Sequence, residues 1–261
     1  MRGRGTVAGI GMLLLAASCG GAPLVTMPGM LTMERAESSD AMMQRYFPGM
    51  TGTFYVLKGD PEAPVFGLIA DGKDPGKVAL AGAGRQKSWS EAVPLEGGGV
   101  EVTGVVPQQI LMGDIHKDGT PEVMLVLEVE AKDAKLGLTQ KRVAAYLYEL
   151  GKNLRLVWYH TLSLSADFAS QCASGEVRHE GSATFGADAE GRLAEVAVKF
   201  ERTVRVCKGG EGCPAGLKCS RTSDDGTLRF VLDKELKTLR LENETEASTR
   251  VPDLSVIDLA R

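Results

Sequence analysis

Residues 194–206 alternate between apolar and polar side chains, which restricts this part of the chain to a β-strand. The apolar positions are Ala194, Val196, Val198, Phe200, Val204 and Val206, and the polar positions between them include Glu195, Lys199, Glu201, Thr203 and Arg205. Successive side chains of a strand point to opposite faces of the sheet. The segment therefore predicts a long strand with one buried face and one solvent-exposed face.

The same period of two recurs along most of the chain. It appears in residues 154–162, 177–185 and 228–232, and residues 151–153, 186–191 and 224–226 provide glycine-containing turn signals between such segments. A total of 32 glycines and an aromatic content of 5% fit a chain with many turns. We therefore expect an all-β protein, an antiparallel meander of consecutive hairpins that is partial-propeller, sandwich or barrel-like. One short N-terminal helix is expected within residues 33–46.

The first 19 residues have the pattern of an export signal. Arg2 and Arg4 are followed by an apolar run from Val7 to Ala17, which is shorter than the roughly 20 residues that a membrane-spanning helix needs. Small residues at 16–18 precede Cys19. The run is therefore interpreted as a signal peptide rather than as a membrane anchor.

Residues 13–19 (LLLAASC) resemble the lipobox of bacterial lipoproteins. This resemblance implies diacylation of the Cys19 sulfur, cleavage before Cys19 and acylation of the new amino terminus. Gly20 and Gly21 resemble the arrangement in lipoproteins that are sent to the outer membrane. The alternative is an ordinary secretory signal that is cleaved nearby, with Cys19 incidental.

The expected domain organisation follows from this signal. Residues 1–18 form the signal peptide, residues 19–32 an uncharged, lipidated tether, and residues 33–261 a single β-rich domain. Removal of the signal changes the formal net charge from −4 to −6. Such a chain is not attracted electrostatically to nucleic acid, and residues 82–88 lack the spacing of a phosphate-binding loop, so no nucleotide is expected.

Residues 113–122 (GDIHKDGTPE) lie between two apolar runs and carry oxygen ligands at alternating positions. Oxygen atoms of this kind, together with a glycine that closes the loop, suit a hard cation such as calcium. The segment resembles the calcium loop of FG-GAP or VCBS-type β-propeller repeats. The resemblance implies a calcium site formed by the carboxylates of Asp114, Asp118 and Glu122 and the carbonyl of Thr120.

His116 occupies the third position of this loop, where the family has Asp or Asn, and imidazole is a poor calcium ligand. Three outcomes remain open. The loop binds calcium weakly with His116 turned away, or it takes a softer metal, or it has lost its ion and persists as a hairpin. Any ion bound there is expected to be structural, and no other cofactor is expected.

Four cysteines remain for disulfides if Cys19 carries lipid: Cys172, Cys207, Cys213 and Cys219. An even number in an exported chain predicts two bridges with three possible connectivities. The preferred pairs are Cys172 with Cys207 and Cys213 with Cys219, which would staple a glycine-rich loop over residues 207–219.

Two functions compete on sequence grounds. The first is an outer-membrane-anchored lipoprotein of the bacterial cell envelope that is a non-catalytic binding or scaffold module for an envelope protein or a glycan. The second is an envelope hydrolase whose carboxylates assemble only in the fold. The first is preferred because the sequence contains no nucleophile elbow and no zinc-protease motif.

Overall fold

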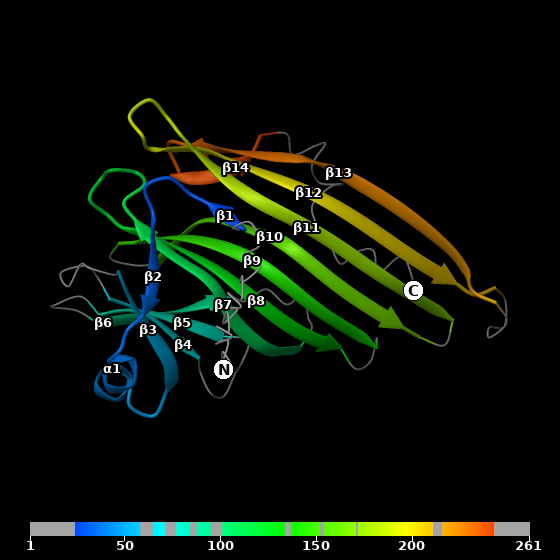
Figure 1. Ribbon diagram of the computed structural model, residues 1–261, viewed down its shortest axis with the longest axis horizontal. Coiled ribbons are helices and arrows are strands. Elements are labelled where there is room, and N and C mark those ends of the chain that lie inside the picture. The colour runs from blue at the N-terminus through cyan, green and yellow to red at the C-terminus, as the bar shows by residue number, and fades with distance from the viewer. Residues whose placement is uncertain are drawn as a thin grey trace, which may run out of the picture.

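The computed structural model describes residues 24–57, 65–70, 77–83, 88–94, 101–133, 137–151, 154–170, 172–210 and 216–242. These ranges contain one helix, α1 (Ser39–Tyr46), and fourteen strands (Figure 1). The strands are β1 (Val25–Thr26), β2 (Leu31–Arg35), β3 (Thr51–Leu57), β4 (Val65–Ala70), β5 (Lys77–Ala83), β6 (Ser88–Pro94), β7 (Glu101–Gly113), β8 (Glu122–Asp133), β9 (Leu138–Leu150), β10 (Leu154–Ala169), β11 (Ala173–Ala187), β12 (Leu193–Lys208), β13 (Lys218–Asp233) and β14 (Thr238–Leu241).

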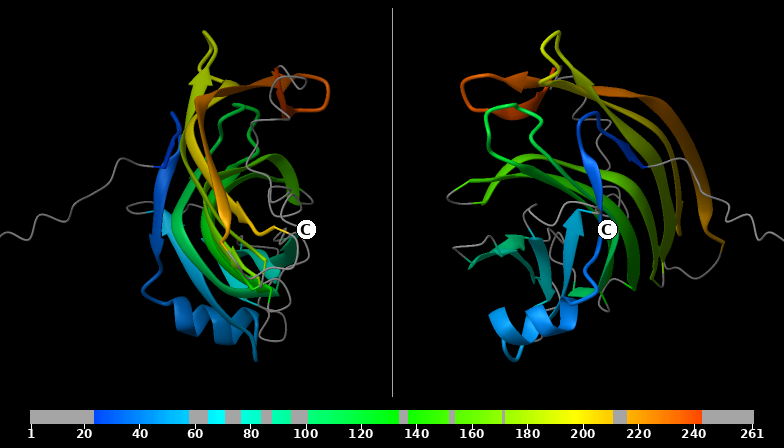
Figure 2. Two further views of the ribbon diagram at one scale, coloured as in Figure 1. Left: turned by 90° about the vertical axis from the view of Figure 1, so that its right-hand side faces the viewer. Right: turned by 60° about the vertical axis from the view of Figure 1, so that its left-hand side comes forward.

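Thirteen of the strands follow one another in a single sheet path. From β7 to β14 each strand pairs antiparallel with the next one in the chain, and β2 joins β7 to the smaller run β3–β6. The path ends at β14 on one side and at β6 on the other, so the sheet is open. Figure 2 shows that the long strands form one strongly curved layer. The predicted all-β antiparallel meander is confirmed.

Strand β10 is one of the irregular strands of the sheet. Its pairing with β9 has two register shifts, one between Leu156 and Trp158 and one between Thr161 and Ser163. Only the later half of β10 pairs with β11, and β1 pairs with β11 at Ala183 instead. Because bulges bend the strand that carries them, β10 and β11 diverge at this point.

The main core lies beside this divergence. The Trp158 ring on β10 makes edge-on contacts with Phe185 of β11 and Phe230 of β13, at centroid distances of 5.2 and 5.7 Å. A second cluster covers the other face of β8 and β9, which includes Leu125 and Tyr146. Strand β9 is buried on both faces over residues 142–148, which explains why its sequence is not alternating there.

The structure corrects the expected N-terminal boundaries. The expected short helix is confirmed within residues 33–46 and spans Ser39–Tyr46, whereas residues 33–35 belong to β2. Residues 25, 26, 31 and 32, expected in the tether, lie in β1 and β2. Val25 and Met27 are buried, so this uncharged segment supplies core side chains. Its close approach to β7 requires a glycine at 113, because a Cβ there would lie 2.4 Å from the Gly29 carbonyl oxygen.

Two further predictions are wrong. Residues 224–226 were expected to form a turn but lie inside β13, where Gly226 is opposite Phe200 of β12. Cys207 is bonded to Cys219 across the β12–β13 ladder, which excludes both preferred pairings. Pairing along the whole of β12 brings the two cysteines opposite each other. Cys172 is exposed, and Cys213 lies outside the described residues.

Within the described ranges, no helix is long and apolar enough to cross a membrane.

Candidate functional site

The loop between β7 and β8 folds around the Asp114 carboxylate. Its two oxygens accept the backbone N–H groups of Asp118 and Gly119 at 3.1 and 2.9 Å, and Asp118 accepts the N–H of Thr120 at 3.0 Å. Gly119 has a φ of +84°, the left-handed conformation for which glycine is best suited. The sequence-based assignment of Gly119 as the residue that closes the loop agrees with this geometry.

Glu122 is the buried centre of the loop. Its side chain is fully buried, and its two oxygens contact the Ile115 N–H at 2.9 Å and His116 Nδ1 at 2.5 Å. A buried carboxylate is costly unless it is paired and hydrogen-bonded. His116 occupies the loop position at which the third oxygen ligand is expected. It therefore serves here as the partner of Glu122, the last residue of the expected ligand set.

Two overlapping groups of possible ligands share Glu122. The ligand atoms of Asp114, Asp118 and Glu122 lie within 4.8 Å of one another, and the same holds for His116, Glu122 and Glu149. Glu149 is directly opposite Glu122 in the β8–β9 ladder, a position that the sequence does not reveal without the strand register. The first group is close enough to share one cation.

Side-chain cations already contact two of these carboxylates. Lys237 Nζ, from the turn before β14, lies 2.9 Å from Asp118 Oδ2, and Arg155 donates to both oxygens of Glu149 at 2.6 and 3.2 Å. The hydrogen bond from Lys237 lowers the pKa of Asp118, and the hydrogen bond from Arg155 lowers the pKa of Glu149. Lys237 would therefore compete with a metal ion at Asp118.

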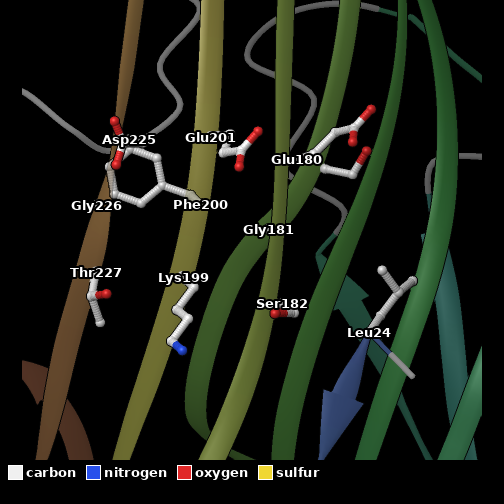
Figure 3. Close-up of a pocket in the computed structure, with 11 residues that line it drawn as sticks. Leu24, Glu180, Gly181, Ser182, Lys199, Phe200, Glu201, Asp225, Gly226 and Thr227 are labelled. Carbon is white, nitrogen blue, oxygen red and sulfur yellow. The ribbon is translucent and has the colours of Figure 1, made fainter. Parts of the chain in front are cut away.

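A separate groove of about 670 Å³ is lined mainly by residues of β10–β13 (Figure 3). Its lining includes Leu24 beside β1 and Ser163 on β10. The other lining residues lie opposite one another in the β11–β12 and β12–β13 ladders. The opposite face of the same strands carries core residues such as Ala183 and Val198. The lining therefore includes Lys199 and Glu201, polar positions in the alternation of residues 194–206, together with Phe200, one of its apolar positions.

Three carboxylates form one row across the groove. Glu180 is directly opposite Glu201, and Glu201 is directly opposite Asp225. Figure 3 shows this row, with Ser182, Lys199 and Thr227 in a second row two residues further along the strands. All three acidic residues are exposed, and the part of the chain that the structure describes offers them no ion pair. With Lys199 as the only cation in the lining, the described groove carries a net charge of −2.

His160 and His179 lie outside the groove lining. Both are buried; His160 contacts Phe230 and His179 stacks on Phe200. Burial lowers the pKa of each histidine to about 4. Both imidazoles are therefore neutral near pH 7.

The residues of the loop are recognisable in the sequence, whereas those of the groove are not. The ligand atoms of Asp114, Asp118 and Glu122 lie close together, His116 contacts Glu122, and Thr120 contacts Asp118 through its N–H. The groove is lined by Leu24, by Ser163 of β10 and by three neighbouring residues of each of β11, β12 and β13. These segments lie far apart in the sequence, so no local motif marks the groove. Cys19 lies outside the described residues.

No protein-family model matches the chain, and neither a curated protein nor a solved structure is significantly similar to it.

Proposed function

We propose that this chain is a lipid-anchored module of the bacterial cell envelope, placed at the outer membrane, that binds a basic segment of another envelope protein without catalysing a reaction. The observation that carries this proposal is the open groove with Glu180, Glu201 and Asp225 in one row. Exposed carboxylates that form no ion pair attract cationic side chains and steer their approach.

The composition of the groove favours a peptide over a glycan. Its polar lining consists of carboxylates, hydroxyl groups and Lys199, and its one aromatic residue, Phe200, belongs to the buried core cluster. A glycan site commonly has an aromatic ring that sugars can stack on, whereas lysine or arginine side chains need only acceptors. The anchor is supported by the lipobox-like residues 13–19.

A basic model peptide tests the groove. We expect the full-length protein in mild detergent to bind a peptide of alternating lysine and glycine, with an affinity that falls as salt screens the charges. The double variant Glu180→Gln, Glu201→Gln should weaken this binding by at least about tenfold, because two charge-assisted contacts are removed. Fluorescence anisotropy of the labelled peptide measures both affinities.

The matched control neutralises two exposed carboxylates outside the groove, Glu130→Gln and Glu195→Gln. This pair changes the net charge by the same amount and should leave the affinity within about twofold, because distant exposed charges are screened. Equal losses in both double variants would show a nonspecific charge effect, and no loss in the groove variant would reject the proposed site.

We further propose that the loop over residues 114–122 is a weak structural calcium site held by Asp114, Asp118 and Glu122. Its support is the proximity of these ligand atoms. At 10 mM calcium and a Kd of about 1 mM, binding would stabilise the fold by about 1.4 kcal/mol, which corresponds to about 3–5 °C in Tm. Differential scanning fluorimetry with calcium and with a chelator measures this shift.

Two variants make the calcium test specific. Asp118→Asn should abolish the response by removing a charged ligand, and Lys237→Met should increase it by removing the competing ammonium group. Magnesium should produce a smaller shift, because it requires a stricter octahedral geometry. Identical melting curves with calcium and with chelator would exclude the site.

A further inference from the structure

Strand β13 presents a long open edge. It runs from Lys218 to Asp233, but β14 pairs only with Phe230–Asp233, and Glu242 bonds to the Arg229 carbonyl. Figure 1 shows β14 alongside one end of β13 only. Within the described ranges, no strand pairs with residues 218–228 on this side. An unpaired edge of eleven residues is a template for a further strand.

The disulfide shows which backbone groups face this edge. Cys207 and Cys219 are directly opposite each other with Cα atoms 3.9 Å apart, the short spacing of a non-hydrogen-bonded antiparallel pair. The N–H and C=O groups of Cys219 therefore point away from β12. By alternation along the strand, the same groups of Arg221, Ser223 and Asp225 also point to the open side.

Charges on the exposed face of this edge are arranged in like-charged pairs. Glu201 of β12 is opposite Asp225 of β13, and four residues further along β12 Arg205 is opposite Arg221. Like charges that are directly opposite destabilise a sheet. The acidic and basic pairs lie at equal distances on either side of Ser223. A two-fold axis through Ser223 would therefore place the acidic pair of each copy beside the basic pair of the other.

We propose that two copies of this chain pair antiparallel through β13, with the two-fold axis at Ser223. Asp225 of each copy then lies opposite Arg221 of the other, and the two sheets become continuous. A centre at Thr222 or Asp224 would set each of these charges opposite an uncharged residue. A centre at Arg221 or Asp225 would set like charges against each other, so charge complementarity selects the axis at Ser223.

The dimer extends beyond the proposed binding function and does not depend on it. Asp225 lines the groove, so the two grooves become neighbours across the axis, and Glu180 and Glu201 remain available to a basic segment. Dimerisation is measured in the absence of any peptide. Failure of the dimer and failure of the groove are therefore separate results.

Cysteine cross-linking tests the axis. In the full-length protein, Ser223→Cys places two thiols directly opposite each other, so mild oxidation should convert most of the protein to a disulfide-linked dimer on non-reducing gels. Ser182→Cys, an exposed serine on β11 well away from the edge, is the matched control and should remain at the level of the unmodified chain. Equal cross-linking of both variants would overturn the proposed axis.

Charge reversal tests the register independently. Arg221→Asp should weaken dimerisation at least tenfold in light-scattering titrations, and the double variant Arg221→Asp, Asp225→Arg should restore it, because each charge again meets its opposite. A monomeric unmodified protein that does not cross-link through Ser223→Cys would overturn the proposal and would indicate that another segment, such as residues 243–261, occupies the edge. Failure of the double reversal to restore dimerisation would also overturn it.

Discussion

Replacement of Glu122 by alanine is expected to lower the free energy of unfolding by about 3 kcal/mol, which corresponds to a decrease in Tm of about 6–12 °C for a domain of this size. The change removes a fully buried carboxylate and leaves the Ile115 N–H and His116 Nδ1 without their acceptor. Unpaired buried polar groups account for most of the expected loss. Urea unfolding in the presence of a chelator measures it without a contribution from calcium.

Two comparisons separate this effect from a general change in charge. Glu122→Gln retains one acceptor oxygen and should lose less stability than the alanine variant. Glu130→Ala, at an exposed position of the same strand, should change stability by no more than about 0.5 kcal/mol. A loss below that level for Glu122→Ala would mean that the loop reorganises without its central carboxylate.

Replacement of Cys19 by serine is expected to move nearly all of the protein from the membrane fraction to the soluble fraction. One acyl chain binds a membrane only marginally, whereas two or three anchor a protein stably. Serine cannot accept the thioether-linked diacylglyceryl group that the lipobox resemblance implies. Ultracentrifugation of lysed cells measures the distribution, and intact-mass spectrometry detects the loss of the lipid.

The matched control for the anchor is Cys172→Ser, the same substitution at an exposed cysteine of the folded domain. It should leave the protein in the membrane fraction. Continued membrane association of the Cys19→Ser chain would exclude lipidation as the anchor, and release of both variants would point to misfolding or proteolysis.

Several long strands were predictable because one buried face imposes a period of two on the sequence. Residues 194–206 fall within β12, and residues 154–162 and 177–185 fall within β10 and β11. The β9–β10 hairpin was also predictable from the turn signal at residues 151–153, since Leu150 pairs antiparallel with Leu154. Local patterns were sufficient here because each strand and its turn signal are adjacent in the chain.

Local patterns failed where distant segments determined the outcome. Residues 224–226 have the composition of a turn, yet pairing with β12 holds them extended and the glycine lies opposite Phe200. The uncharged segment that includes Val25 was interpreted as a tether, but its apolar side chains are buried. In both places, tertiary burial and ladder pairing outweigh the local preference.

The candidate sites show the same division. The aspartates and glycine of the β7–β8 loop were recognisable because a cation-binding loop draws its ligands from one short stretch. Glu149, Arg155 and Lys237 were not, since strand register and the turn before β14 bring them to that loop. The carboxylate row of the groove likewise requires the registers of three strands.

The sequence by itself determined the antiparallel β class, the position of several strands and the closure of the β7–β8 loop at Gly119. These features depend on side-chain alternation and local backbone conformation, which a linear pattern records. The tertiary structure alone decided the Cys207–Cys219 pairing, the acidic row at Glu180, Glu201 and Asp225, and the open edge of β13. Each of these depends on strand register, and a shift of one residue would move every side chain of a strand to the other face.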